Sequence, residues 1–317
     1  MSELQRFYNR STGLWDTTGW WNSANALTAT VDYSILTGSR AYVRDIAATF
    51  GKHKHGRFLN DAYDDEGWWA LAWIRSYDLT RERRYLDAAK SIFADMTRGW
   101  DATCGGGIWW TKRRTYKNAI ANELFLAVAA KLHARTPGDA GPRSYLDWAM
   151  REWSWFDRSG LINARNLVND GLRRCANNGG STWTYNQGVL IGGLVELARA
   201  TGDATLLARA GAIADAAMTT LVDARGILRD RCEPTCNGNR TQFKGVFMRN
   251  LAELAAATGD ARQRAFILTN ADAVWTRARN ARSQFGLVWD GPFDAADASR
   301  QASALDALNA AVASARR

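Results

Sequence analysis

The sequence predicts an all-α protein in which six inner helices form a ring inside six outer helices. Three observations support this prediction. Helical periodicity runs through the chain with no convincing strand pattern, two kinds of helix alternate, and short connections alternate with long ones. With 317 residues, 46% of them hydrophobic, the chain can bury a large core and is not a disordered chain.

Apolar residues at helical spacing predict twelve helices, near residues 2–10, 20–37, 40–50, 64–79, 82–98, 117–135, 141–157, 182–201, 203–221, 241–258, 260–280 and 299–314. Helices such as 82–98 and 203–221 are apolar on one face, as expected with one side in water. Segments 68–74 and 188–195 are apolar on nearly all sides, so they must be covered by other helices.

The connections explain how these helices are arranged. Tight Gly-containing turns follow the second, eighth and tenth helices, whereas the connections 51–63, 99–116, 158–181, 222–240 and 281–298 are long. The first helix lacks an inner partner and the last lacks an outer one, which favours a closed ring over an open solenoid. We therefore expect one domain over residues 1–317, with all long loops on the rim that holds the N-terminal ends of the inner helices.

Charge and cysteine content limit the possible classes of function. The net charge of +9 comes from scattered arginines, so we expect solvated helix faces and no nucleic-acid partner. No 18-residue stretch lacks a charge, which argues against a membrane-spanning segment, and no secretion signal pattern opens the sequence. The three His are not spaced for a metal site. Cys232 with Cys236, and Cys104 with Cys175, could form disulfides outside the cytoplasm or remain free thiols.

A group of carboxylates at the start of the fourth predicted helix is the strongest candidate for chemistry. Four acidic residues, Asp61, Asp64, Asp65 and Glu66, lie within the six positions 61–66. Helix capping explains only one of these four. Repulsion between such close carboxylates raises the pKa of at least one, which places an acid beside a base. Fifteen Trp residues suit the apolar faces of sugar rings. The pattern predicts a glycosidase, and the adjacency of the pair favours the retaining mechanism.

Several blocks of sequence resemble glycoside hydrolase family 76. They are Gly13-Leu14-Trp15-Asp16, Trp20-Trp21-Asn22-Ser23-Ala24-Asn25, Asp64-Asp65 before Trp68-Trp69, Gly106-Gly107-Ile108-Trp109-Trp110, Lys117-Asn118-Ala119-Ile120-Ala121-Asn122-Glu123, Thr184-Tyr185-Asn186-Gln187-Gly188 and Phe243-Lys244-Gly245. The resemblance implies an (α/α)6 barrel and a secreted or wall-associated endo-α-1,6-mannanase that needs no metal or cofactor. It also implies that Asp64 is the nucleophile and Asp65 the acid/base of a retaining hydrolysis.

Further polar and aromatic residues near the predicted rim are candidates for contacts with α-1,6-mannan or mannooligosaccharides. They are Asn25, Asp61, Trp69, Trp109, Trp110, Asn118, Asn122, Tyr185, Asn186, Gln187, Phe243 and Lys244. The asparagines could equally be buried and hydrogen-bonded, the two tryptophans at 109 and 110 could anchor their loop, and Lys244 could offset the charge of the aspartates.

Three other functions are compatible with parts of the pattern. A transglycosylase would use the same fold, with a sugar hydroxyl in place of water, and a non-catalytic glycan-binding protein would keep only the aromatic surface. An isoprenoid cyclase would need an Asp-Asp-x-x-Asp motif, but Trp68 occupies the last position. We expect a monomer.

Overall fold

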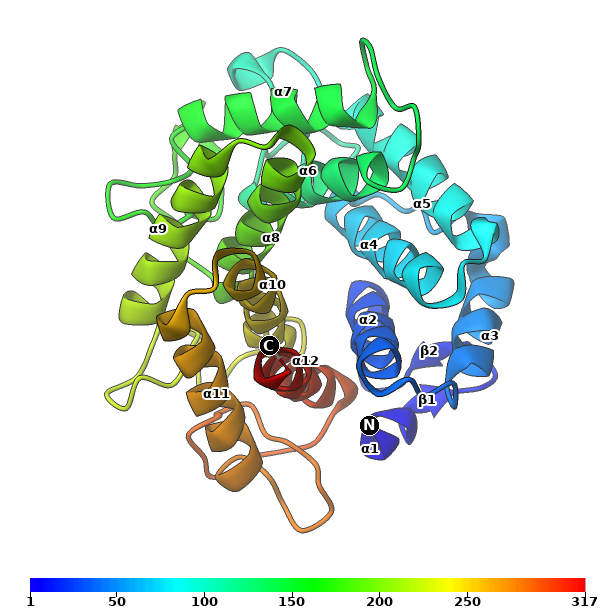
Figure 1. Cartoon of the computed structure of the whole chain (residues 1–317), viewed down its shortest axis with the longest axis vertical. Helices are drawn as coiled ribbons and strands as arrows, with labels where there is room; N and C mark the ends of the chain where they lie inside the picture. Colours follow the sequence, from blue (N-terminus) through cyan, green and yellow to red (C-terminus); the bar gives the residue numbers. More distant parts are fainter. Residues whose placement is uncertain (317) are drawn as a thin grey trace.

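The computed structural model describes residues 1–316, and it contains the predicted ring of helices (Figure 1). The inner helices are α2 (Trp20–Thr37), α4 (Tyr63–Thr80), α6 (Ala119–His133), α8 (Thr184–Thr201), α10 (Phe243–Thr258) and α12 (Ala298–Ala315). The outer helices are α1 (Ser2–Gln5), α3 (Val43–His53), α5 (Arg83–Met96), α7 (Tyr145–Arg158), α9 (Ala204–Thr220) and α11 (Ala261–Thr276). Each inner helix contacts the next, and α12 contacts α2, so the ring closes and the (α/α)6 prediction is confirmed.

Short elements lie between these helices. They are the 3-10 helices η1 (Lys54–Gly56), η2 (Thr97–Gly99), η3 (Thr103–Gly105) and η4 (Arg240–Gln242), and the antiparallel hairpins β1 (Tyr8–Asn9) with β2 (Leu14–Trp15) and β3 (Leu172–Arg173) with β4 (Ala176–Asn177). The predicted helix over 2–10 is too long, because α1 ends at Gln5. The Asn9 side chain accepts a hydrogen bond from the Ser11 amide, and the Gly13 amide bonds the Asn9 carbonyl, which favours a turn here.

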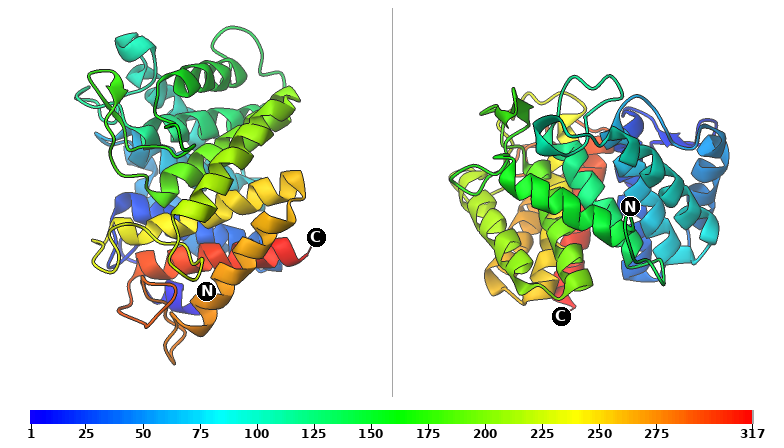
Figure 2. Two further views of the ribbon diagram at one scale, coloured as in Figure 1. Left: turned by 90° about the vertical axis from the view of Figure 1, so that its left-hand side faces the viewer. Right: turned by 90° about the horizontal axis from the view of Figure 1, so that it is seen from above.

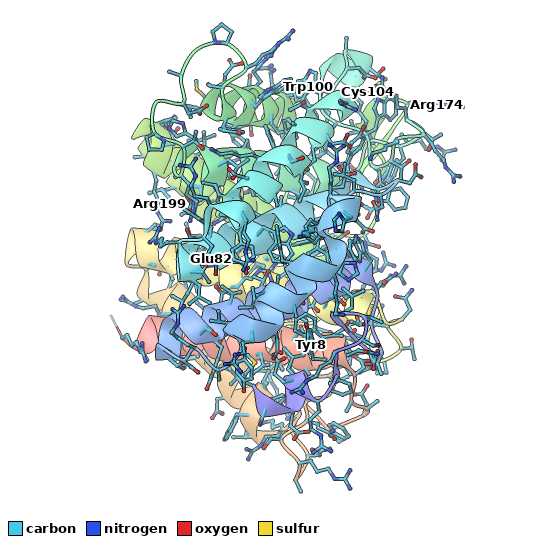
Figure 3. The ribbon with its side chains drawn as sticks, turned by 90° about the vertical axis from the view of Figure 1, so that its right-hand side faces the viewer. Tyr8, Glu82, Trp100, Cys104, Arg174 and Arg199 are labelled. Atoms are coloured by element: carbon cyan, nitrogen blue, oxygen red, sulfur yellow. A yellow bond between two sulfur atoms is a disulfide. The ribbon has the colours of Figure 1, made fainter. Side chains whose placement is uncertain are left out.

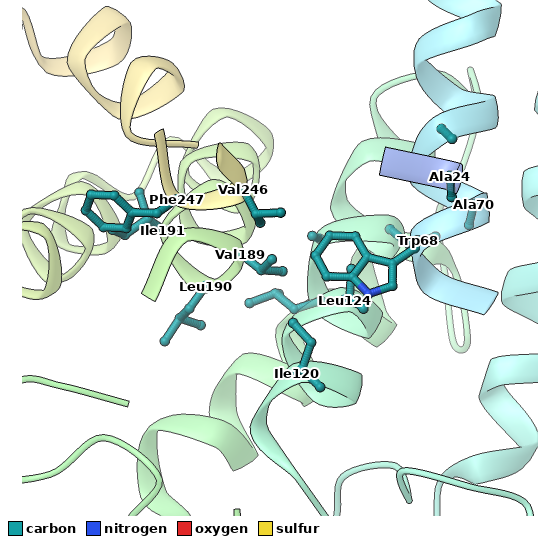
Figure 4. Close-up of a cluster of buried hydrophobic side chains, with 14 of the residues drawn as sticks. Ala24, Trp68, Ala70, Ile120, Leu124, Val189, Leu190, Ile191, Val246 and Phe247 are labelled. Carbon is teal, nitrogen blue, oxygen red and sulfur yellow. The ribbon is translucent and has the colours of Figure 1, made fainter. Parts of the chain in front are cut away.

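Burial separates the two rings as the sequence predicts. On α6 every residue from Ala119 to Leu132 is buried, whereas α5 buries one face, which includes Tyr85 and Phe93. Apolar side chains from neighbouring inner helices meet inside the ring, among them Trp68, Leu124 and Val189 (Figure 4). None of the helices within residues 1–316 combines the length and apolarity needed to cross a membrane.

The long connections gather at one end of the molecule (Figure 2), which we call the loop rim. Five of the six inner helices hold the preceding loop through the side chain of their fourth residue. The pairs are Ser23 with the Trp15 amide, Glu66 with the Asn60 amide, Asn122 with both backbone groups of Ile108, Gln187 with both backbone groups of Val168, and Gln301 with the Phe285 amide. These side chains therefore fix the loops to the ring.

The opposite end of the ring carries the short turns. Gly202 and Gly259 have φ angles of 74° and 73°, in the left-handed region, and Asp203 and Asp260 then cap α9 and α11. The turns predicted from Gly-Asp pairs are therefore present.

Close approach of inner helices depends on glycine. A Cβ atom added at Gly245 of α10 would lie 2.5 Å from the Ser303 Cα atom of α12. We expect Gly245→Ala to lower the free energy of unfolding by about 1–3 kcal/mol, because the helix backbones must separate. Gly211→Ala on α9, where an added Cβ meets nothing within 4 Å, should instead be neutral or stabilising. Urea denaturation of both variants tests this difference, and equal stabilities would contradict it.

Two carboxyls lie inside the wall of the barrel without a hydrogen-bond partner among the described residues. Glu123 of α6 and Glu152 of α7 are fully buried, and burial raises the pKa of both well above the ordinary value. The folded protein therefore keeps protons that the unfolded chain releases.

This burial makes stability depend on pH. The stabilising contribution is complete below about pH 4.5 and decreases as the pH rises toward the folded pKa values, by about 1.4 kcal/mol per pH unit for each carboxyl. We expect the double variant Glu123→Gln/Glu152→Gln to flatten the fall in melting temperature between pH 5 and pH 8. Glu82→Gln, at a half-exposed carboxylate, is the control. An unchanged slope in the double variant would show that these carboxyls are ionised in the folded protein.

Candidate active site

The candidate aspartates lie at the start of α4, where the chain pairs with the loop before α6. The Asn60 side chain accepts a hydrogen bond from the Ala62 amide, and Ala62 forms an isolated β-bridge with Thr111. The Tyr63 amide donates to the Trp110 carbonyl at 2.9 Å. These bonds fix the first turn of α4 against the segment that carries Trp110.

Each aspartate has its own neutral hydrogen-bond donors. Asp64 accepts the Trp110 indole N–H on Oδ2 at 2.9 Å and the Asp65 amide on Oδ1 at 3.1 Å. Asp65 accepts the Asn60 side-chain amide on Oδ2 at 2.6 Å. Both aspartates remain partly exposed. The pair is therefore accessible to solvent, and its two carboxyls accept hydrogen bonds from different donors.

Burial raises the pKa of both carboxyls. The pKa of Asp64 rises to about 7, through burial and then the charge of Asp65, and the pKa of Asp65 also rises through burial. The pair therefore holds one proton over the acidic to neutral range. The two N–H donors on Asp64 stabilise its ionised form and oppose this rise in pKa, but they do not cancel it.

The other two acidic residues of the cluster have charged partners. Glu66 is fully buried and lies 2.8 Å from the Lys112 ammonium, which also contacts Asp95. Asp61 is exposed and pairs with Arg113 at 3.3 Å. The two adjacent aspartates are thus the members of the cluster that form no ion pair with a cation within residues 1–316.

A series of aromatic rings runs beside the pair, along the N-terminal ends of four inner helices. In order they are Trp183, Phe243, Tyr185, Trp68 and Trp21, with centroids 5.6, 3.8, 6.4 and 5.6 Å apart. Tyr185 and Phe243 are almost parallel, at 4°. Trp68 and Phe243 are buried, whereas Trp21, Trp183 and Tyr185 are partly exposed and so available to the apolar face of a sugar ring.

Among the residues predicted to bind substrate, the structure brings Trp110, Tyr185 and Phe243 into this neighbourhood. Trp110 is 41% exposed and contacts Asp64 directly. Asp61 lies on the same turn, with its charge paired.

Other predicted residues lie in structural positions. Asn122 and Gln187 are fully buried loop tethers, and Trp69 is a core residue stacked on Trp73. Lys244 is 2% exposed, pairs with Glu233 at 2.8 Å and so does not neutralise the aspartates.

The remaining candidates are also mostly buried. Asn25 accepts a hydrogen bond from Arg249, and Asn118 caps α6. Trp109 donates its indole N–H to Asp101, which anchors its loop. Asn186 is fully buried without a hydrogen-bond partner among the described residues.

Sequence reasoning missed two contributors. Asn60 directly precedes the acidic segment and was assigned no role. Its side-chain amide nevertheless reaches forward to Asp65, five residues later in the first turn of α4. Trp183 precedes the block that begins at Thr184 and was not distinguished from fourteen other Trp residues.

Both possible cysteine pairs are disulfides. Cys104–Cys175 links the loop that carries Trp110 to the β3–β4 hairpin, and Cys232–Cys236 closes a short loop before α10. Both lie on the loop rim, where they restrict the loops around the aspartates (Figure 3 labels Cys104).

Comparisons with known proteins agree with this architecture. The chain is 27% identical to the mannan endo-1,6-alpha-mannosidase DFG5 of Candida albicans over 76% of this chain and 60% of that protein. It is also 27% identical to DCW1 of Saccharomyces cerevisiae, over 84% of this chain and 65% of that protein. The matches thus span about three fifths of the length of these relatives.

Solved structures with the same fold include the Lin0763 protein of Listeria innocua, with 26% identity and a TM-score of 0.85 over 98% of this chain and 94% of that one. An inactive variant of an α-1,6-mannanase of Salegentibacter sp. HEL1_6, in complex with α-1,6-mannotetrose, has 23% identity and a TM-score of 0.87 over 98% and 96%. The family model for glycosyl hydrolase family 76 matches residues 2–317. The chain therefore belongs to glycosyl hydrolase family 76.

Proposed function

We propose that this protein is an endo-acting α-1,6-mannanase that hydrolyses its substrate with retention of anomeric configuration. The observation that carries the proposal is the Asp64–Asp65 pair, which lies on the loop rim beside the aromatic series and in which burial raises the pKa of both carboxyls. It is the sole Asp-Asp dipeptide in the sequence. The Salegentibacter mannanase variant that is inactive has two consecutive aspartates replaced by alanine.

The two carboxyls divide the chemistry. The ionised Asp64 forms a bond to the anomeric carbon as the glycosidic C–O bond breaks, and Asp65 donates its proton to the departing oxygen. In the second step Asp65 takes a proton from water, whose oxygen bonds to the anomeric carbon and releases Asp64. The donors observed on Asp64 support the anionic role, and the second oxygen of Asp65 accepts no hydrogen bond from the described residues.

The two disulfides support a place of action outside the cytoplasm. The four cysteines form two disulfides, which persist in oxidising surroundings. The curated relatives are fungal mannan endo-1,6-alpha-mannosidases. We propose that the protein acts outside the cytoplasm as a single-domain monomer.

We expect Asp64→Ala and Asp65→Ala each to reduce turnover of linear α-1,6-mannan by about 10³-fold or more, because each removes one half of the acid/base and nucleophile pair. Asp61→Ala, in the same segment, should retain far more activity. Circular dichroism should show that all three variants stay folded. Near-normal rates in both pair variants would refute the assignment.

Proton NMR of the first product from α-1,6-mannan tests the stereochemistry and the reaction type together. We expect the α-anomer to appear first. If the β-anomer appears first, the reaction is a single displacement without a covalent intermediate. Elongated products in the presence of acceptor mannooligosaccharide, without hydrolysis, would show a transglycosylase instead.

Trp110 should set the pH profile of the reaction. The wild-type kcat/KM should decline above about pH 7, where the pair loses the shared proton. In Trp110→Phe the loss of the indole N–H removes a donor that stabilises ionised Asp64, so the pKa of Asp64 increases and the limbs of the profile move to higher pH. Trp275→Phe, at an exposed tryptophan of α11, should leave the profile unchanged. A higher KM with an unshifted profile would make Trp110 a sugar contact only.

A further inference from the structure

The net positive charge of the protein is confined to the loop rim. The six connections that precede the inner helices, residues 6–19, 54–62, 97–118, 159–183, 221–242 and 277–297, contain 19 basic and 10 acidic residues. This excess of nine equals the net charge of the whole chain, so the helices and short turns contain 22 basic and 22 acidic residues. The scaffold is therefore electrically balanced, although its 22 carboxylates include Asp64 and Asp65.

Many of these cations have no carboxylate partner. Eight of the 19 take part in ion pairs within residues 1–316, among them Arg113 with Asp61 and Lys117 with Asp101, and eleven do not. Ten of these eleven are arginines. An unpaired guanidinium at the surface keeps its five N–H donors available to a ligand.

Four of the unpaired arginines belong to the two loops that flank the aromatic series. Arg240 lies over the Trp183 ring, 4.9 Å from its centroid, and Arg231 donates to the Ser181 hydroxyl at 3.4 Å. Arg173 and Arg174 are exposed on the β3–β4 hairpin, beside Cys175, which is bonded to Cys104 of the Trp110 loop. Figure 3 shows Arg174 projecting outward on the same side of the molecule as Cys104.

The other end of the barrel shows the opposite arrangement. A cavity of about 320 Å³ at the C-terminal ends of the inner helices is lined by several cations, but most are matched by carboxylates. Arg75 pairs with Asp32 at 2.5 Å, and Lys131 lies 3.0 Å from Glu253. The cations that line this cavity are therefore mostly neutralised, and the net excess of positive charge lies at the end that holds the aspartates.

We propose that the substrate is an anionic mannan, an α-1,6-mannan that carries phosphodiester groups, and that the unpaired arginines of the loop rim bind those groups. The inference rests on the proposed function, because it concerns the glycan that reaches Asp64 and Asp65. Uncharged mannan gives no reason for nine excess cations around its binding surface. Arginine in place of lysine favours phosphate oxygens, which accept two parallel N–H bonds from one guanidinium.

The proposal has a second physical consequence. Cations concentrated on one rim attract a polyanion toward that rim and orient it before contact, and added salt screens the attraction. The rest of the chain carries no net charge. Binding of the charged glycan should therefore depend strongly on ionic strength, whereas binding of neutral mannan should not.

The test compares kcat/KM for three α-1,6-mannooligosaccharides of equal length: one neutral, one bearing a phosphodiester and one bearing a uronate. At low salt we expect the phosphodiester substrate to exceed the neutral one by about tenfold, with the ratio approaching one in about 0.5 M NaCl. A uronate substrate that equals the phosphodiester would overturn the commitment to phosphate.

Two double variants locate the interaction. The ratio of kcat/KM for the phosphodiester substrate to that for the neutral one, at low salt, should fall severalfold in each of Arg231→Gln/Arg240→Gln and Arg173→Gln/Arg174→Gln. Because the two pairs lie in different loops, a folding defect in one variant does not affect the other. The matched control is Arg40→Gln/Arg83→Gln, which removes the same charge from exposed, unpaired arginines near the short turns. The control should keep the wild-type ratio.

The outcomes separate this inference from the proposed function. Equal kcat/KM for neutral and phosphodiester substrates at low salt would overturn the inference and leave the mannanase assignment intact. A ratio that all three double variants retain would also overturn it. Failure to cleave any of the substrates would instead refute the proposed function.

Discussion

In five of the six inner helices, hydrogen bonds between the fourth residue and the preceding loop hold the functional end of this protein together. Asn122 and Gln187 show the arrangement most fully, since each bonds both backbone groups of one loop residue. Amide side chains in buried positions need such partners, and isolated loop backbone needs them equally. These hydrogen bonds therefore satisfy both the buried amide side chains and the loop backbone, and they hold the long loops in defined positions above the ring.

That arrangement determines what the aspartates can do. The loop fixed by Asn122 continues to Trp110, whose indole reaches Asp64, while Asn60 reaches Asp65 from the other side. Different neutral donors on two adjacent carboxyls give them different proton affinities, and no cation of the described residues forms an ion pair with either. A cation beside the pair would instead favour ionisation of both carboxyls.

The sequence predicted the ring and the acidic pair because both depend on local patterns. Apolar periodicity identified every large helix within a few residues, and four carboxylates in six positions marked the start of α4. Long-range contacts could not be predicted in this way. Lys244 meets Glu233, and Asn122 meets Ile108, through loop conformations that periodicity does not specify. The donation from Trp110 to Asp64 joins residues 46 positions apart, so no local pattern reveals it.

In this protein, stability and recognition depend on different parts of the chain. The helices bury the core and carry balanced charge, while the loops contain the disulfides, the indole of Trp110 and the whole of the excess charge. A loop that keeps its attachment residue, such as Ile108 or Val168, can vary elsewhere at small cost to the ring. The architecture thus permits transplantation of recognition segments between homologues, which makes this barrel a suitable host for engineering new carbohydrate selectivity.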